Sequence, residues 1–245
     1  MKFPDEVTLR LRNARRVTVL TGAGISAESG VPTFRDAQSG LWANYKPEEL
    51  ATPQAFRRNP AKVWEWYSMR RDMIKKIKPN AGHFALVEIE KRIPEFLLVT
   101  QNIDDLHRLA GNKNVVEIHG NIRRTKCFEE DVVIDTWEPT DDIPPRCPRC
   151  GGMLRPDVVW FGEMLPQDAF ERSSEAARTC DIFFSIGTSG LVYPAASLPY
   201  EAINKNIFSI EINTEETPLT RYVDHHFRGL SGEILPRLVS RSWPT

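Results

Sequence analysis

The stretch VTVLTGAGISAESG, residues 17–30, decides the fold of this 245-residue chain. A β-branched apolar run that ends in Thr-Gly-Ala-Gly and passes into helix-compatible residues predicts a strand, a tight turn and a helix N-terminus. Gly22 and Gly24 leave no side chain where a pyrophosphate would approach the backbone, and a helix N-terminus favours an anion. The stretch therefore predicts a phosphate-binding turn. A tight strand-to-helix turn without a ligand is the alternative.

The segment after this turn differs from that of a dehydrogenase. A dehydrogenase carries an acidic residue about 20 residues after the glycines, at the end of its second strand. This chain has instead TFRDAQSGLW at residues 33–42, a polar loop with an arginine and aromatic side chains. We therefore do not expect the nucleotide to be held as in an enzyme that transfers a hydride.

Composition limits the class of protein. A hydrophobic content of 41% is enough for a sizeable core, as one large domain or a domain with an insert. The net charge of −1 gives no field that would attract nucleic acid or a membrane surface. No apolar run is long enough to span a membrane, and the acidic N-terminus is unlike a signal peptide. We expect a cytoplasmic monomer without nucleic-acid or membrane partners.

Apolar periodicity predicts helices that alternate with strands. Helices are expected over 7–16, 47–56, 60–77, 81–92, 167–178, 195–204 and 231–239. Strands are expected from residue 17 and over 96–100, 115–118, 182–186 and 207–212, the last clear strand. This alternation predicts an α/β fold, a doubly wound parallel sheet. Residues 121–158 are polar, rich in proline and cysteine-bearing, which predicts a separate small module.

Polar or glycine-containing motifs follow four of the predicted strands. They lie at residues 21–24, 101–104, 119–120 and 187–189. Each motif alone is as consistent with a helix cap as with a ligand site. In open α/β sheets, however, ligands bind beyond the carboxyl ends of the strands, so the four motifs are expected to converge on one site.

His119 is the candidate general base. A histidine is more often structural than catalytic, but this one ends a predicted buried strand beside a glycine, in the expected crevice. Its unperturbed pKa of about 6.5 suits proton transfer near neutral pH. The other four histidines, His83, His107, His225 and His226, lack this combination of position and neighbours.

Six motifs in order resemble the sirtuin family of NAD-dependent protein lysine deacylases. They are GAGIS at 22–26, PTFR at 32–35, TQNID at 100–104, HG at 119–120, GTS at 187–189 and INTE at 212–215. The resemblance extends from about residue 10 to residue 236. It implies two domains with NAD and acyl-lysine meeting between them. The Rossmann-like large domain would comprise 1–36, 79–121 and 159–245, and the small domain a helical insertion at 37–78 and a zinc-ribbon-like module at 122–158.

The resemblance also implies roles for individual residues. The NAD-binding residues would be Gly22, Ala23, Gly24, Ile25, Phe34, Arg35, Gln101, Asn102, Ile103, Asp104, Gly187, Thr188, Ser189, Asn213 and Glu215. Asn102 and Asp104 would lie near the nicotinamide ribose, with His119 as the base. The products would be nicotinamide, free lysine and O-acyl-ADP-ribose. Such a reaction needs no protein nucleophile, and the chain has no convincing Ser-His or Cys-His arrangement.

Two segments resemble those between which sirtuins hold an extended peptide as an added strand. They are VVWFGE at 158–163 and GLVYP at 190–194. Main-chain hydrogen bonds would give affinity with little sequence preference. The substrate-binding residues would be Ala51, Tyr67, Arg70, Val159, Trp160, Phe161, Gly162, Val192 and Tyr193. An ordinary core segment or loop is the alternative for either segment.

The pattern Tyr67-Ser68-Met69-Arg70 resembles the sirtuin subgroup that removes succinyl and malonyl groups. Residues at i and i+3 share a helix face. Ala51 would widen the acyl pocket, and Arg70 would bind a distal carboxylate through a hydrogen bond worth about 1.5–3 kcal/mol. We therefore expect acidic acyl chains to be preferred and acetyl-lysine to be accepted. A pair that serves only packing is the alternative.

Cys127, Cys147 and Cys150 fall within the polar module and suggest a metal site. The sirtuin family normally uses two Cys-x-x-Cys pairs for zinc, and only the second pair is intact here, since the first reads Cys127-Phe-Glu-Glu130. Glu130, Asp131 or water would complete a zinc site, or the module would fold without metal. Cys180 is expected to be a small buried residue.

Two other functions remain open at this point. An ADP-ribosyltransferase could use the same nucleotide cleft with a different acceptor. A nucleotide-sensing or zinc-ribbon binding module could use it without turnover. The presence of His119, Asn102 and Asp104 together argues against an inactive site.

Overall fold

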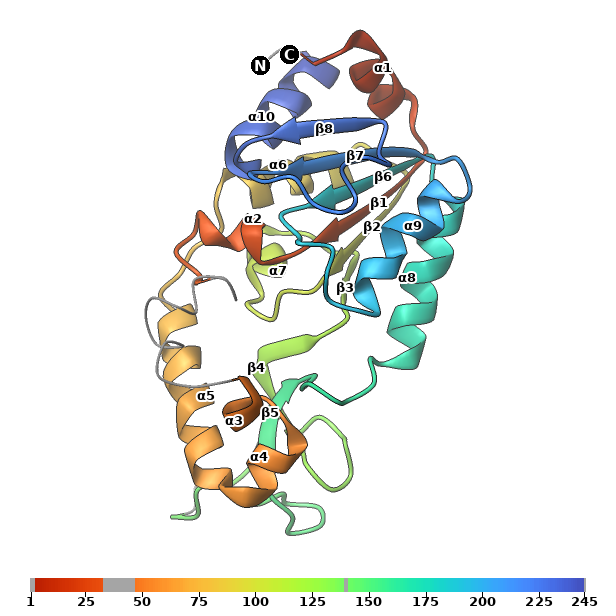
Figure 1. Ribbon diagram of the computed structural model, residues 1–245. Coiled ribbons are helices and arrows are strands. Elements are labelled where there is room, and N and C mark those ends of the chain that lie inside the picture. The colour runs from red at the N-terminus through yellow and green to blue at the C-terminus, as the bar shows by residue number, and fades with distance from the viewer. Residues whose placement is uncertain (1–2, 33–46, 139–140, 245) are drawn as a thin grey trace.

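The computed structural model describes residues 3–32, 47–138 and 141–244, and its largest element is a six-stranded parallel sheet (Figure 1). The strands are β1 Arg16–Thr21, β2 Glu95–Thr100, β3 Val115–Glu117, β6 Ile182–Ile186, β7 Phe208–Asn213 and β8 His225–Arg228. Their spatial order is β3-β2-β1-β6-β7-β8. Starting from β1, the chain adds β2 and then β3 on one side. It then returns and adds β6, β7 and β8 on the other side of β1. This order confirms the predicted doubly wound sheet and puts its switch point between β1 and β6.

Helices cover both faces of this sheet (Figure 1). One face carries α1 Asp5–Asn13, α6 Ala81–Glu90 and α10 Ser231–Ser242. The other carries α8 Gln167–Thr179 and α9 Leu198–Ile203, which follows a 3₁₀ turn, η3 Ala195–Ser197. Along β1, Val17 and Val19 pack on the first face and Leu20 on the second. Burial on both faces explains why the strands are nearly continuous apolar runs.

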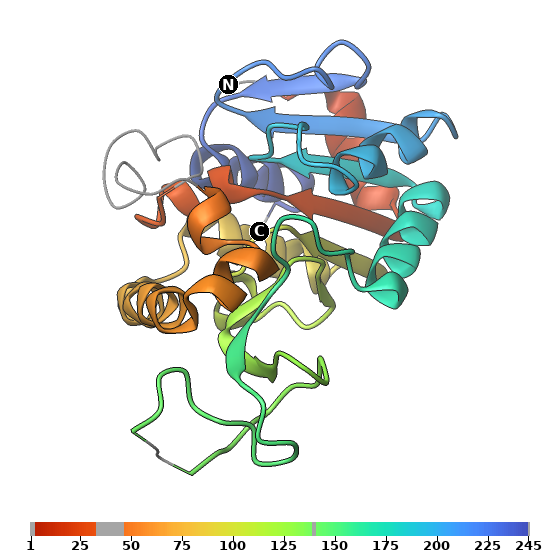
Figure 2. The same cartoon turned by 60° about the horizontal axis from the view of Figure 1, so that its bottom comes forward.

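A second part of the fold lies beyond the carboxyl ends of β1, β2 and β3 (Figure 1). It consists of α3 Pro47–Leu50, α4 Pro53–Arg58, α5 Pro60–Ile74 and the antiparallel pair β4 Gly120–Cys127 and β5 Leu154–Val158. These helices and strands share their own core, in which Phe56, Trp66 and Trp160 are buried. The connection from β4 to β5 extends away from the large sheet (Figure 2). The domain boundaries proposed from the sequence remain a proposal.

The structure differs from the predicted elements in several places. Helix α1 ends at Asn13 and not at Arg16, and α10 continues to Ser242. The helix expected over 47–56 is divided into α3 and α4, because the Thr52 hydroxyl caps a new helix by accepting from the Ala55 N–H at 3.1 Å. Helix α5 ends at Ile74 and not at Ile77. The strand over 207–212 is not the last, because β8 pairs in parallel with β7. Two histidines in a four-residue strand gave no apolar pattern to detect.

The remaining short helices follow strands of the main sheet. They are α2 Ala23–Ala27 after β1 and α7 Leu106–Ala110 after β2. None of the helices in the described residues has the length and apolar character needed to cross a membrane.

Candidate functional site

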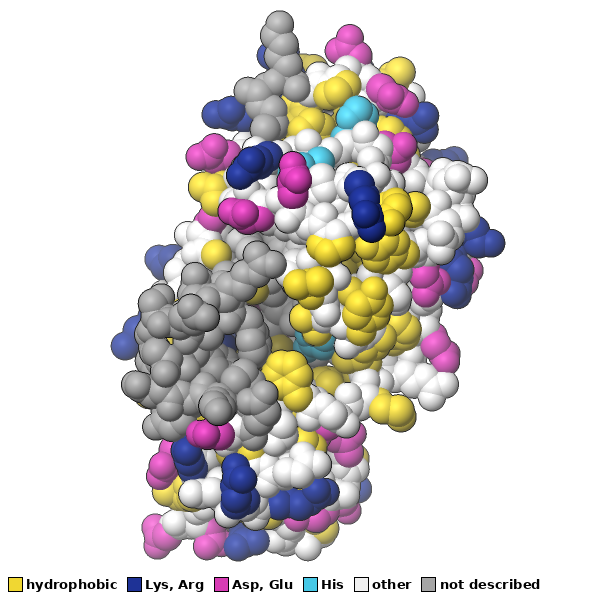
Figure 3. All heavy atoms as spheres, in the orientation of Figure 1, with side chains coloured by type: hydrophobic (Ala, Val, Ile, Leu, Met, Phe, Trp, Pro, Cys, Tyr) yellow, Lys and Arg dark blue, Asp and Glu magenta, His cyan; other side chains and the backbone are white. Residues whose placement is uncertain are grey.

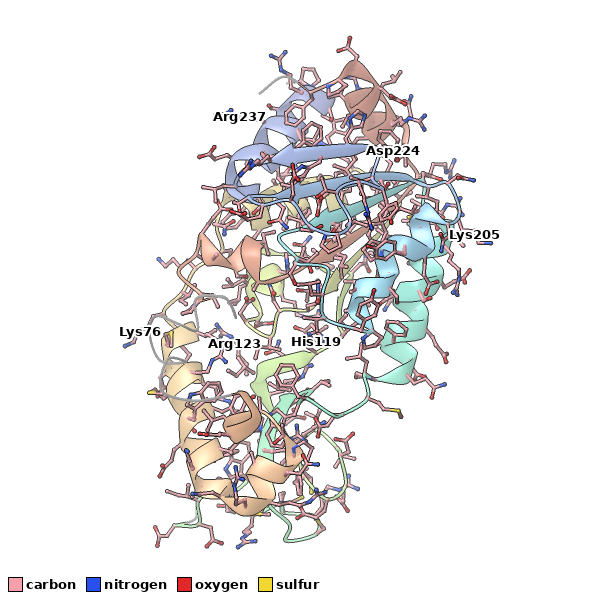
Figure 4. All side chains as sticks on the ribbon, viewed as in Figure 1. Lys76, His119, Arg123, Lys205, Asp224 and Arg237 are labelled. Carbon is pink, nitrogen blue, oxygen red and sulfur yellow. The ribbon has the colours of Figure 1, made fainter. Side chains whose placement is uncertain are left out.

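A cavity of about 740 Å³ opens at the carboxyl ends of the parallel strands, between the two parts of the fold. All four predicted strand-end motifs contribute to its lining, so they converge as expected. His119 lies between the large sheet and β4 (Figure 4). The volume is within the range of sites for small molecules and cofactors, about 300–1,000 Å³. The switch point of the sheet therefore carries a formed site.

Most of the predicted site residues line this cavity. Those predicted for the nucleotide are Gly22, Ala23, Gly24, Gln101, Asn102, Ile103, Asp104, Gly187, Thr188, Ser189, Asn213 and Glu215. Those predicted for the substrate are Ala51, Tyr67, Arg70, Val159, Trp160, Phe161, Gly162, Val192 and Tyr193. Ile25 does not line the cavity, because its side chain is fully buried in the core under α10. Phe34 and Arg35 lie outside the described residues.

The glycines of the first turn are required by a protein contact. A Cβ atom on Gly24 would lie 2.7 Å from the Cα of Gly187, and one on Gly22 would lie 2.8 Å from the Gly187 oxygen. The Gly24 N–H donates to this same oxygen at 2.8 Å. The turns after β1 and β6 thus touch backbone to backbone. The absence of side chains at Gly22 and Gly24 is explained by this packing, which fits the tight turn that the sequence offered as the alternative to room for a pyrophosphate.

Asn102 is held rigidly at the base of the cavity. Its side-chain amide donates to the Gly22 oxygen at 3.0 Å and to the Ser26 hydroxyl at 3.1 Å. Its backbone N–H donates to the Thr100 hydroxyl at 3.0 Å. Ser26 is fully buried and also hydrogen-bonds Asp104. The sequence analysis quoted Ser26 within a motif but did not select it, although a buried hydroxyl one turn after the glycines is a signal for such a role.

A second set of hydrogen bonds orients the loop after β6. The Gln101 amide donates to the Thr188 hydroxyl at 2.9 Å, and the Asn213 amide donates to the Thr188 carbonyl at 2.8 Å. Three strand ends are thereby joined around one threonine. The cavity wall formed by Gln101, Thr188 and Asn213 is fixed before any ligand binds.

Asp104 is a buried carboxyl group beside Asn102. It is 3% exposed, and one of its oxygens accepts from the Leu106 N–H at 2.9 Å. Burial raises the pKa of Asp104, and the hydrogen bonds from Leu106 and Ser26 oppose that rise. The group is a hydrogen-bond acceptor where a sugar hydroxyl could be bound.

His119 is held in one tautomer by its surroundings. Its Nδ1 lies 3.0 Å from the backbone oxygen of Gln101. Because a carbonyl oxygen can only accept, Nδ1 carries the proton and Nε2 keeps its lone pair. Burial lowers the pKa of His119, and the bond to Gln101 opposes this effect. The ring is therefore neutral at pH 7, with Nε2 as the basic atom.

Tyr67 and Arg70 line the side of the cavity formed by α5. Tyr67 is 3% exposed, and its hydroxyl accepts from the Trp160 indole N–H at 3.0 Å. Its own hydroxyl proton remains available for an acceptor. The Arg70 guanidinium lies 4.8 Å from the centre of the Trp66 ring. Burial lowers the pKa of Arg70, and Tyr67 and Asp104 oppose that shift.

The two candidate peptide segments border the mouth of the cavity. Phe161 is 49% exposed and Tyr193 is 69% exposed. Figure 3 shows hydrophobic side chains gathered at this level, between the large sheet and the second part of the fold. The Val159 N–H donates to the His119 oxygen, and the Phe161 N–H to the Ala51 oxygen, both at 2.9 Å. An extended segment placed beside His119 would therefore meet ordered main chain and exposed apolar side chains.

Four side chains at the far end of β4 and β5 form a candidate metal centre. They are Cys127, Glu130, Cys147 and Cys150, and their ligand atoms all lie within 4.8 Å of one another. Ligands at about 2.3 Å from a tetrahedral zinc ion are roughly 3.8 Å apart. The Cys127 and Cys150 sulfurs are 3.5 Å apart, which fits. Asp131, the other candidate ligand, is not part of this group and pairs with Lys126, while Glu130 also pairs with Arg149 at 3.1 Å. The set could hold one zinc ion, with Glu130 in place of the missing thiolate.

Metal analysis of protein purified without added metal is expected to find about one zinc ion per chain. The Cys147→Ser variant should lose the metal and melt at a lower temperature, because the small module has only a minor apolar cluster around these residues. Cys180→Ser is the matched control, since Cys180 is buried under the large sheet and should not affect metal content. A wild-type protein free of metal would contradict the assignment.

The chain is similar to known proteins in both sequence and structure. The model of the Sir2 family matches residues 22–194. The chain is 53% identical over 213 residues to an NAD-dependent protein deacylase of Aquifex aeolicus, covering 86% of this chain and 89% of that protein. It is 50% identical over 240 residues to the deacylase of Pyrococcus abyssi, covering 96% of each chain. A Sir2 homolog solved in complex with NAD superimposes with a TM-score of 0.90 at 43% identity, covering 98% of this chain and 94% of the other.

Proposed function

The chain belongs to the Sir2 family and is an NAD-dependent protein deacylase, and we propose that it preferentially removes succinyl and malonyl groups from lysine and also accepts acetyl-lysine. The family match selects the deacylase over the transferase and the non-catalytic module. The acyl preference depends on one observation, a partly buried arginine, Arg70, in the lining of the cavity beside Tyr67.

The charge of Arg70 favours an acidic acyl chain. The Arg70 guanidinium lines the cavity and is positively charged, so it attracts an anion placed beside it there. The carboxylate oxygens lie four bonds beyond the lysine nitrogen in malonyl-lysine and five in succinyl-lysine. Such a carboxylate would form a charge-assisted pair with Arg70, and the Tyr67 hydroxyl would donate to it as well. Ala51, which lines the same cavity, leaves room that a larger side chain would fill. An acetyl group would fit this space without using the charge.

The residues around the cavity support a division of roles. Backbone and amide groups of Ala23, Gln101, Ser189 and Asn213 would hold NAD at the strand ends. When bound, NAD supplies the ADP-ribosyl group that accepts the acyl chain as nicotinamide leaves. His119 would take up a proton at Nε2 from a ribose hydroxyl. The rigid Asn102 amide and the buried Asp104 carboxyl group would orient the sugar beside it.

The acyl preference is tested with two versions of one peptide, succinylated and acetylated, compared by nicotinamide release. In the Arg70→Met variant, kcat/KM for the succinyl peptide is expected to fall at least tenfold, since about 1.4 kcal/mol corresponds to a factor of ten. Activity on the acetyl peptide should remain within about twofold, because the acetyl group has no charge to lose. Arg58→Met, an exposed position in the last turn of α4, is the matched control and should change neither value.

Equal losses on both peptides in Arg70→Met would refute the role of Arg70. A wild-type enzyme without preference for the succinyl peptide would refute the acidic-acyl proposal itself. Neither result would affect the assignment to the deacylases.

The proposed base predicts a particular pH dependence. Burial lowers the pKa of His119 below its unperturbed value, so the neutral, basic form of the ring predominates above that value. The rate should therefore be level above about pH 6.5 and fall only as the pH drops below that unperturbed value. A pH profile of kcat/KM at saturating NAD measures this. A midpoint above pH 7 would exclude a buried, neutral His119 as the base.

A further inference from the structure

Arg155 and Glu163 form an ion pair to which the proposed NAD and acyl sites give no role, and the Glu163 side chain is only partly buried, with 22% of its surface exposed. Arg155, on β5, is 2% exposed. Both terminal nitrogens of its guanidinium contact the Glu163 carboxylate, with Nη2 to Oε2 at 3.0 Å. Nη2 also donates to the Val158 oxygen at 2.6 Å. The arginine thus joins the end of β5 to the last residue of the following turn.

Glu163 closes the turn that carries the predicted peptide-binding residues. Its Oε2 accepts from the Trp160 N–H at 2.7 Å, and its own N–H donates to the Trp160 oxygen at 3.0 Å. Residues 160–163 are therefore held from both ends of the turn. Removal of the carboxylate would leave the Trp160 N–H without this acceptor and Arg155 without its anion.

The same pair fixes the indole ring of Trp160. The Arg155 guanidinium carbon lies 3.3 Å from the centre of that ring, a close cation–π contact. The indole N–H, at the edge of the same ring, donates to the Tyr67 hydroxyl at 3.0 Å. A continuous set of contacts therefore leads from the ion pair through Trp160 to a side chain in the lining of the cavity.

We propose that Arg155 and Glu163 are positioning residues for the acyl-lysine substrate. They act through Trp160, which presents the turn 160–163 to the peptide and orients the Tyr67 hydroxyl toward the acyl chain. The part of the inference that concerns Tyr67 rests on the proposed function, and the part that concerns the turn does not. The pair should affect substrate affinity and leave the NAD site unaltered.

The Glu163→Gln variant tests this directly. Its amide group would turn one donor toward Arg155, which has no acceptor to offer. We expect KM for an acetylated peptide to rise about tenfold, with kcat and KM for NAD within about twofold of wild type. Glu201→Gln is the control, because Glu201 pairs with Arg178 at the surface, 2.7 Å apart and away from the cavity. An unchanged peptide KM in Glu163→Gln would overturn the proposal.

A double variant separates positioning from stability. Breaking one side of a buried ion pair is strongly destabilising, whereas replacing both sides with apolar residues is often tolerated. Arg155→Met with Glu163→Met should therefore fold, yet still show a peptide KM raised about tenfold, since the Trp160 N–H loses its acceptor. A folded double variant with wild-type peptide KM would overturn the proposal, as would failure of both variants to fold.

The succinyl-to-acetyl ratio of the wild-type enzyme is measured in the same series. If the wild type shows no acidic-acyl preference, the proposed specificity fails. The peptide KM of the Glu163 variants still decides the positioning role of the pair, so the two failures are distinguishable.

Discussion

Replacing His119 by alanine is expected to slow NAD-dependent deacylation by about 10²- to 10⁴-fold, the range that a positioned general base contributes. The substitution removes the basic Nε2 atom and also releases the Gln101 oxygen from its bond to Nδ1. The Asn102 and Thr188 contacts that shape the nucleotide side of the cavity do not depend on the ring. NAD should therefore still bind to the variant.

Nicotinamide release with an acyl peptide measures the rate, and the NAD-dependent rise in melting temperature measures binding. His225→Ala on β8, at the far edge of the sheet, serves as the control and should keep wild-type activity. A residual rate above about one tenth of wild type would argue against a general base in this position. Loss of NAD binding in His119→Ala would show that the ring supports the cavity and not only the chemistry.

Acidification is expected to destabilise the fold by about 3 kcal/mol between pH 6.5 and 4 through His83 alone, at 1.36 kcal/mol for each pKa unit. His83 is fully buried, and burial lowers its pKa to about 4. His107, whose ring centre is 4.8 Å away, also has its pKa lowered by burial and then by His83. Below pH 6.5 the unfolded chain binds protons that the folded chain does not. The free energy of unfolding therefore falls as the pH falls.

Chemical denaturation at a series of pH values measures this slope. The slope is proportional to the number of protons taken up on unfolding. The His83→Gln variant should reduce this number by close to one, because glutamine does not titrate. A glutamine at this position can also replace the capping bond in which His83 Nδ1 accepts from the Asn80 N–H. Phe84→Leu, at the exposed neighbouring position, should leave the slope unchanged. An identical slope in His83→Gln would show that His83 does not account for the acid sensitivity.

The sheet could be predicted from the sequence because each of its inner strands is a short apolar run followed by polar or glycine residues. Those endings also located the cavity, since parallel strands bring their carboxyl ends to one edge. Strand β8 and the break between α3 and α4 were missed for local reasons. The half-buried edge strand β8 contains two histidines and has no apolar alternation. The Thr52 cap starts a new helix within a stretch whose apolar pattern is helical on both sides.

The contacts inside the site could not be predicted in the same way. The bond from Asn102 to Ser26 joins residues 76 positions apart, and its existence depends on how closely the segments after β1 and β2 pack. The sequence identified Cys127 and the intact Cys147–Cys150 pair, but the choice of Glu130 over Asp131 follows from which carboxylate the fold brings within 4.8 Å of the three sulfurs. Glu163 stands in the quoted motif VVWFGE, but its pairing with Arg155 could not be predicted, because two charged residues eight positions apart are common in any polar segment.

The outermost strands of the sheet, β3 and β8, have three and four residues, whereas the inner strands have five or six. An edge strand exposes unpaired N–H and C=O groups to which a strand of another molecule can add. Edges this short offer few such groups in the described residues. Uncontrolled edge-to-edge association between copies of the chain, the usual first step of β-aggregation, is therefore disfavoured by the lengths of these two strands, without any special charge on them.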